Sequence, residues 1–64
     1  MNIFCQPFET DRITDPKVAQ KRALDYANKV NEQEGNVIFT ISECADDYGH
    51  YITVWYKSMK KVEV

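Results

Sequence analysis

The sequence has few cysteine, glycine and proline residues, with two of each among its 64 residues. The cysteines, Cys5 and Cys44, allow at most one disulfide bridge, far below the density of a secreted scaffold built on disulfides. Glycine occurs only as Gly35 and Gly49, so there is no glycine-rich loop of the kind that binds phosphate groups. No segment approaches the ~18–20 consecutive apolar residues of a membrane-spanning helix.

The chain also lacks an excess of positive charge and an N-terminal targeting signal. Its formal net charge is −2, whereas a general nucleic-acid binder normally carries a strong basic excess. The first residues, MNIFCQPF, contain neither a basic segment nor a long apolar run, so we expect no signal peptide. We therefore expect a soluble, cytoplasmic protein with free thiols and no contact with a membrane.

The first half of the chain predicts a short strand followed by a helix. Residues 2–5, NIFC, form an apolar run that Pro7 ends, because proline cannot donate to a strand ladder. Thr14-Asp15-Pro16 is typical of a helix start, and Gly35 is typical of a helix end, so we predict a helix over residues 16–34. One stripe of this helix is apolar at helical spacing and consists of Ala19, Ala23, Tyr26, Ala27 and Val30.

The second half of the chain predicts a β-hairpin, with strands at residues 37–44 and 51–58 and a flexible tail at 59–64. An even number of loop residues places Ile41 opposite Val54 and Thr40 opposite Trp55. The face expected to meet the helix then consists of Val37, Phe39, Ile41, Ile52, Val54 and Tyr56. The second face consists of Ile38, Thr40, Ser42, Tyr51, Thr53 and Trp55.

These elements predict one α+β domain over residues 1–64 with the order β-α-β-β. One helix is expected to pack on one face of a three-stranded sheet, and the last two strands form the C-terminal hairpin. This order is common among small bacterial and phage accessory proteins.

Catalytic or metal chemistry finds little support in the residues. Cys44, Asp46, Asp47 and His50 cluster around the hairpin turn, but they lack the spacing of a structural zinc site. Cys44 and His50 are also expected on opposite faces of the hairpin, and nothing else resembles an oxyanion hole. We therefore predict no catalytic residues, no metal and no cofactor.

The second face of the hairpin provides the main indication of function. It carries Tyr51 and Trp55, and the sequence contains no second helix that would cover them. Exposed aromatic patches on small proteins usually mark contacts. We predict a small non-enzymatic protein–protein interaction module, such as an accessory, inhibitor or host-directed phage-type protein, that binds another protein or a second copy of itself. The predicted contact residues are Ile38, Thr40, Tyr51, Thr53, Trp55 and the acidic turn Asp46, Asp47 and Tyr48.

Two alternatives stay open for the same face. Tyr51 and Trp55 could stack on unpaired bases, with Lys57, Lys60 and Lys61 contacting phosphates, in a single-stranded nucleic-acid binder. Otherwise residues 1–13 fold back over this face, and Trp55 becomes a core residue packed against Phe4 or Phe8.

Overall fold

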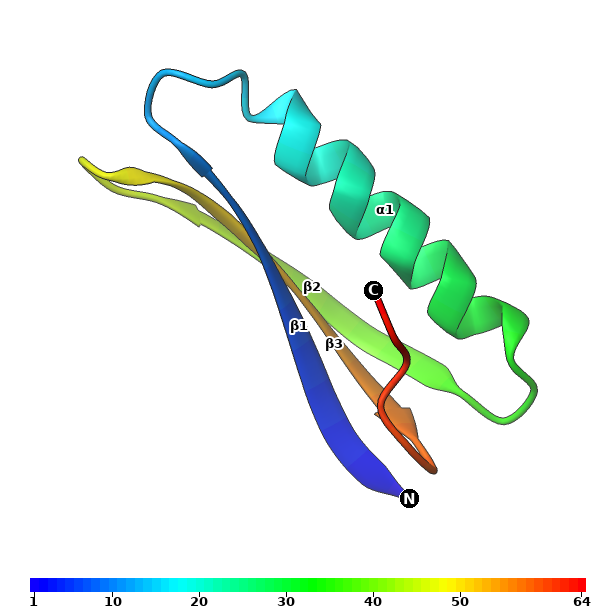
Figure 1. Cartoon of the computed structure of the whole chain (residues 1–64). Helices are drawn as coiled ribbons and strands as arrows, with labels where there is room; N and C mark the ends of the chain where they lie inside the picture. Colours follow the sequence, from blue (N-terminus) through cyan, green and yellow to red (C-terminus); the bar gives the residue numbers. More distant parts are fainter.

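The computed structural model describes residues 1–64 as one helix on one face of a three-stranded antiparallel sheet. The elements are β1 (Asn2–Asp11), α1 (Lys17–Glu32), β2 (Val37–Ala45) and β3 (Gly49–Ser58). The strand order is β1-β3-β2, so the last strand in the chain lies at the centre of the sheet. Figure 1 shows α1 across one face of the sheet, with no element on the other. The predicted α+β class and the β-α-β-β order are confirmed.

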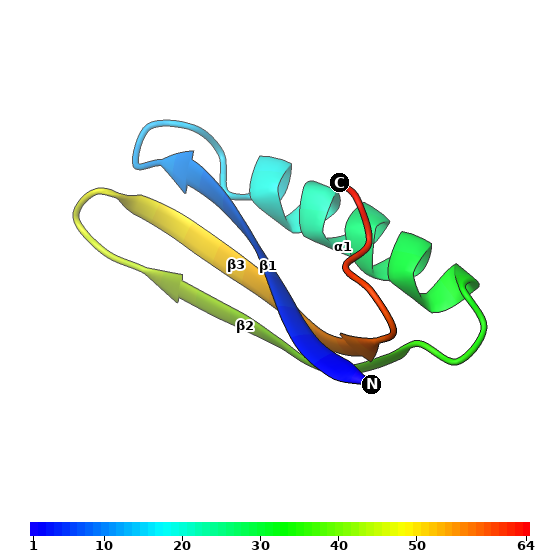
Figure 2. The ribbon, with the colours of Figure 1, turned by 60° about the horizontal axis from the view of Figure 1, so that its bottom comes forward.

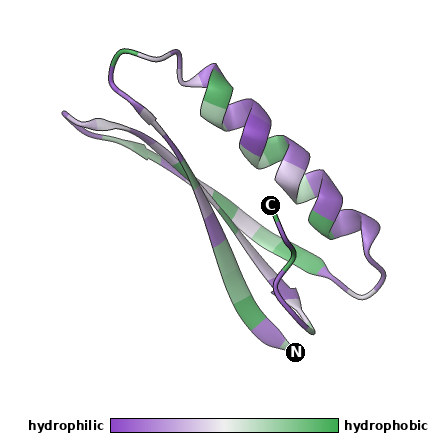
Figure 3. Ribbon diagram, in the orientation of Figure 1, coloured by the Kyte–Doolittle hydropathy of each residue, from purple (hydrophilic) through white to green (hydrophobic).

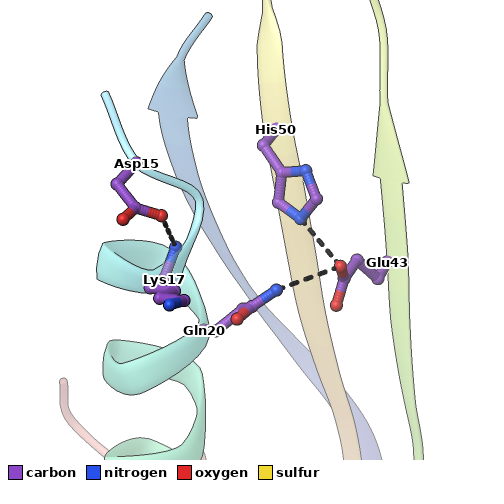
Figure 4. Close-up of polar contacts among 5 residues, drawn as sticks. All are labelled: Asp15, Lys17, Gln20, Glu43 and His50. Carbon is purple, nitrogen blue, oxygen red and sulfur yellow. Dashed lines mark hydrogen bonds and ion pairs between the residues drawn. The ribbon is translucent and has the colours of Figure 1, made fainter. Parts of the chain in front are cut away.

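The limits of α1 follow from local hydrogen bonds. The Asp15 carboxylate accepts from the Lys17 N–H at 3.0 Å at the start of the helix, as Figure 4 shows. At the other end, the Asn36 side-chain amide donates to the Val30 carbonyl at 3.1 Å, and Gly35 takes φ +88°. The helix is therefore slightly shorter than the predicted span 16–34. Its buried residues are those of the predicted stripe: Ala19, Ala23, Tyr26, Ala27 and Val30.

Strand β1 is longer than predicted. It continues through Pro7 to Asp11, where the sequence had suggested a stop after residue 5. The Lys61 ammonium donates to the Cys5 carbonyl at 3.1 Å, so Cys5 directs its backbone groups away from β3. Pro7, two residues further along, faces the same way. Its missing N–H therefore lies on the outer edge of the sheet and breaks no ladder bond.

The register between β2 and β3 agrees with the prediction over most of its length. Ile41 pairs with Val54 and Thr40 pairs with Trp55. A β-bulge between Ile38 and Thr40 makes Phe39 an extra residue, so Ile38 rather than Phe39 lies opposite Tyr56.

The bulge reverses the predicted faces of the two residues that precede it. Ile38, which was predicted on the second face, lies on the helix side and packs against the core. Val37 pairs with Lys57 on the opposite side. The bulge thereby brings an isoleucine to the core and leaves the smaller valine exposed.

One residue of the C-terminal segment, Val62, is part of the core. The predicted flexible tail instead turns back between α1 and the sheet, as Figures 1 and 2 show, and the Val62 side chain is buried. The Tyr26 hydroxyl donates to the Val62 carbonyl at 2.6 Å. The Val62 N–H donates to the Tyr56 hydroxyl oxygen at 2.9 Å. These bonds fix a segment that local sequence cannot place.

Candidate functional site

The candidate site is the face of the sheet opposite α1, which we call the open face. Its centre consists of Tyr51, Thr53 and Trp55 on β3, because residues that alternate with the buried Ile52, Val54 and Tyr56 point the other way. Directly paired residues share a face, so the neighbouring strands complete it. β1 contributes Ile3, Cys5, Pro7 and Glu9; β2 contributes Val37, Thr40, Ser42 and Cys44; Lys57 continues the central row.

Trp55 lies in the middle of the open face, between the two outer strands. It pairs with Cys5 on β1 and with Thr40 on β2. Because the Cys5 backbone groups point outward, Cys5 and Trp55 form the closely spaced kind of antiparallel pair, with Cα atoms about 4.5 Å apart. The indole is therefore supported from the side by its cross-strand neighbours and is left half-buried.

The N-terminal residues do not cover Trp55. Phe4 pairs with Tyr56 and Phe8 pairs with Ile52, so both phenylalanines lie on the helix side. Phe8 is a buried core residue in contact with Tyr26, with ring centroids 5.5 Å apart. The alternative in which residues 1–13 fold over the aromatic face is therefore wrong, because these residues form an edge strand instead.

An apolar end of the open face was missed by the sequence reasoning. Ile3 and Val37 are more than half exposed, and both lie beside Lys57. Figure 3 shows the hydrophobic parts of β1 and β2 at this same end of the sheet. The alternation of residues 2–11 could have revealed the β1 part, but Pro7 interrupted the pattern. The β2 part depends on the bulge, which the sequence does not mark.

The acidic turn lies at the opposite end and has a structural role. One Asp46 carboxylate oxygen accepts from the N–H groups of Tyr48 at 2.8 Å and Gly49 at 3.0 Å. The Tyr51 hydroxyl also donates to this oxygen at 3.4 Å. Partial burial and the nearby Asp46 charge raise the pKa of Tyr51. Asp46 is thus engaged within the chain, whereas Tyr48 at the turn is 82% exposed.

The predicted contact residues are brought together only in part. Thr40, Tyr51, Thr53 and Trp55 share the open face, and the turn residues Asp46, Asp47 and Tyr48 lie beyond Tyr51. Ile38 is absent from this face because of the bulge. Of the lysines predicted to contact nucleic acid, only Lys57 lies on the open face. Lys61 donates to the Cys5 carbonyl, and Lys60 lies in the bend directly after β3.

A second group of polar residues lies on the helix side, near the hairpin turn. His50 Nε2 lies 2.9 Å from Glu43 Oε1, and the Gln20 amide donates to the same oxygen at 3.3 Å, as Figure 4 shows. This group links α1 to the two hairpin strands. Cys44 pairs with Tyr51 on the open face, so the sheet separates its thiol from the His50 ring, as predicted.

Neither a metal centre nor a disulfide is formed by these residues. No three His, Cys, Asp or Glu side chains lie close enough together to hold a metal ion. Cys5 and Cys44 lie on the two outer strands with β3 between them, so they are at least about 9 Å apart. A disulfide requires Cα atoms within about 7 Å.

Comparison with models of known protein families, with curated proteins and with solved structures finds no match to the chain. The helix α1 has neither the length nor the apolar character that crossing a membrane requires.

Proposed function

We propose that this chain is a non-enzymatic interaction module that binds another protein through the open face. The observation that carries the proposal is that Tyr51 and Trp55 lie on the central strand, on a face that no element of the chain covers. Tryptophan and tyrosine are the residues most enriched at binding hot spots, particularly near the centre of an interface.

The dimensions of the open face indicate the kind of partner. Three strands about 4.8 Å apart and about ten residues long give a surface of roughly 15 by 30 Å, or about 450 Å². A standard interface buries about 800 Å² on each partner. The open face therefore supports a weak or transient complex, or a complex whose partner also contacts Tyr48 beyond the hairpin turn. A pleated surface of this shape fits the face of another sheet or one side of a helix.

The charges on this face favour a protein partner over nucleic acid. Lys57 is the only positive residue among the open-face residues, and Glu9 lies on the same face. Phosphate contacts provide most of the affinity of nucleic-acid binders. One lysine, whose charge is balanced by one glutamate on the same face, would contribute little affinity for a phosphate backbone.

The test uses Trp55, the only tryptophan of the chain, as both probe and target. The partner is captured from the native cell, purified, and titrated against the wild-type chain while tryptophan emission is recorded. Burial of the indole shifts the emission to shorter wavelength. Trp55→Ala has no tryptophan, so its affinity and that of wild type are compared by isothermal titration calorimetry. Trp55→Ala should weaken binding about 30-fold, which corresponds to roughly 2 kcal/mol. The control is Ile13→Ala, because Ile13 is an exposed apolar residue outside the sheet.

Two results would contradict the proposal. The first is a captured partner that binds Trp55→Ala as tightly as wild type, while circular dichroism shows both chains folded. The second is quenching of Trp55 emission by a mixed-sequence single-stranded oligonucleotide, with affinity that falls steeply as salt rises. The second result would replace the protein partner with nucleic acid.

A further inference from the structure

The two edges of the sheet are protected to different degrees. On the β1 edge, Pro7 offers no N–H, and Lys61 occupies the Cys5 carbonyl. The β2 edge, VIFTISECA, contains neither proline nor lysine, and every residue in it except Ile38 is exposed. Natural proteins usually block edge strands with such residues or with β-bulges, and the bulge of β2 lies at Phe39. The part of this edge where another strand can add therefore runs from Thr40 to Ala45.

The pairing within the hairpin shows which β2 backbone groups are free. The Asp46 N–H donates to the Gly49 carbonyl at 2.9 Å, so Asp46 directs its backbone groups toward β3. Residues at steps of two point the same way, and Ser42 and Cys44 therefore also face β3. Ile41 and Glu43 direct their N–H and C=O groups away from the sheet and toward solvent.

Apolar side chains lie beside this free edge. Ile41 is 47% exposed and Leu24, on α1, is 58% exposed. They lie along a groove of about 240 Å³ between the helix and the hairpin, together with Gln20, Ala23, Glu43 and Ile52. The β2 edge thus combines free backbone groups with an apolar surface that a packed strand would cover.

We propose that β2 pairs antiparallel with β2 of a second copy of the chain, with Ile41 opposite Ile41 of that copy on a twofold axis. Ile41 is the midpoint of Val37–Ala45, so this register aligns the two strands end to end and keeps the central residues Thr40–Ser42 clear of the bulge at Phe39. It also joins free backbone groups, because Ile41 donates to and accepts from its counterpart. The two Ile41 and two Leu24 side chains then close the groove from both sides.

The charge of the strand fits a second copy. Glu43 is the only charged residue of β2, and its carboxylate already accepts from Gln20 and lies against His50. In this register the two Glu43 residues are offset by four residues, or about 14 Å along the strands. This distance exceeds the Debye length of about 8 Å at physiological salt, so no like charges oppose each other.

The area agrees with a modest affinity. A nine-residue edge is about 30 Å long, and the helix and sheet layers beside it are about 15 Å deep. Each copy therefore contributes about 500 Å², or about 1,000 Å² in total, at the lower limit for a specific interface. We expect a dimer with micromolar affinity. The six-stranded sheet carries both helices on one side and both Trp55 residues on the other, so this contact does not rest on the proposed function.

The test is sedimentation of the full chain over a range of concentrations. Wild type should change from monomer to dimer as the concentration rises through the micromolar range. Ile41→Lys should raise the dimer dissociation constant at least tenfold, because it places two charges together on the axis. The matched control is Ile3→Lys, because Ile3 is an exposed isoleucine on the opposite edge strand β1, and this variant should leave the dimer unchanged.

The register is tested by cysteine crosslinking in a chain with Cys5→Ser and Cys44→Ser. Thr40 of one copy lies opposite Ser42 of the other in this register. Copies carrying Thr40→Cys should therefore form disulfides with copies carrying Ser42→Cys. Two copies that both carry Thr40→Cys, or both carry Ser42→Cys, should form far fewer disulfides.

Three outcomes would overturn the proposal. One is wild type that stays monomeric up to roughly 1 mM, a concentration at which even a weak dimer forms. Another is an Ile41→Lys variant, folded by circular dichroism, that dimerises as wild type does. The third is a dimer abolished by Trp55→Ala alone, which would move the contact to the open face. A monomeric chain that binds a foreign strand in an Ile41-dependent way would assign the edge to that partner instead.

Discussion

The hydroxyl groups of Tyr26 and Tyr56 form a closed cycle of hydrogen bonds with the backbone of Val62. Because each hydroxyl has one proton, the donor of every bond in the cycle can be assigned, and the effect of removing each hydroxyl can be predicted. Tyr26 donates its only hydroxyl proton to the Val62 carbonyl, so the 2.7 Å bond between the two tyrosines must use the Tyr56 proton. The Val62 N–H completes the cycle by donating to the Tyr56 oxygen. All three residues are buried, so a broken bond is not replaced by water while the tail stays in place.

Removing one hydroxyl or the other should therefore have unequal effects. Tyr26→Phe leaves both the Val62 carbonyl and the Tyr56 proton without partners. Each such buried group costs about 1–3 kcal/mol, so we expect a loss of about 2–6 kcal/mol. Tyr56→Phe leaves only the Val62 N–H without a partner, because Tyr26 still donates to the carbonyl, and should cost about 1–3 kcal/mol. The total free energy of unfolding of a 64-residue domain is only about 3–10 kcal/mol, so either loss is a large part of it.

The measurement is urea denaturation of the two single variants and the double variant, supported by thermal unfolding. Each kcal/mol should lower the midpoint temperature by about 4–8 °C in a domain of this size. The double variant should lose less free energy of unfolding than the sum of the losses of the two single variants. In the double variant, Tyr56→Phe removes the hydroxyl proton that Tyr26→Phe alone leaves without an acceptor. Equal losses for the two single variants, or a strictly additive double variant, would refute this account of the cycle.

Three further predictions concern packing and pH. Gly49→Ala should destabilise the domain by about 1–3 kcal/mol in a denaturant titration, because a Cβ at this position overlaps the Thr10 carbonyl oxygen. Ala23→Leu should cost about 1–3 kcal/mol in the buried stripe, whereas Lys21→Ala on the exposed face should change stability by less than ~0.5 kcal/mol; equal effects would contradict the assigned faces. Burial and the hydrogen bond with Tyr56 raise the pKa of Tyr26 above its ordinary value near 10, so the folded state holds this proton more tightly than the unfolded chain. Its contribution to stability should be complete below pH 10 and should be lost as the pH rises further, with a smaller slope in Tyr26→Phe.

Local patterns in the sequence predict most of the fold. The alternation of residues 40–44 and 51–55 was sufficient to place Ile41 opposite Val54, because only one register keeps the apolar residues on one face. The Ala-lined stripe of α1 was equally clear from helical spacing. The same kind of reasoning predicted too short a first strand, ending before Pro7, whereas β1 continues to Asp11. The sequence does not show which strand lies at an edge or which side of that strand is unpaired.

The remaining differences come from interactions between distant parts of the chain. The bulge at Phe39 moves Ile38 to the core, and alternation alone gives no sign of an extra residue. Val62 is held in place by hydrogen bonds to the hydroxyl groups of Tyr26 and Tyr56, which are distant in sequence. The local sequence of residues 57–61 is polar, and it therefore predicted only a solvated tail. For the candidate site, sequence placed Tyr51, Thr53 and Trp55 together, and the structure adds Ile3 and Val37.

The position of β3 at the centre of the sheet has a consequence for how the chain folds. β3 is the last element in sequence order, and Asn2 at the start of β1 pairs with Ser58 at its end. A hairpin of β2 and β3 can form from local contacts, but β1 pairs with β3 only through long-range contacts, of which Asp11 with Gly49 is the nearest in sequence. Closing such a long loop is a slow step. During synthesis, β1 and α1 have no complete sheet to pack on until β3 has emerged from the ribosome. Until then Phe8 and the apolar stripe of α1 stay exposed to solvent. Because exposed apolar surface promotes aggregation, a long pause in translation before that point should increase aggregation of the chain.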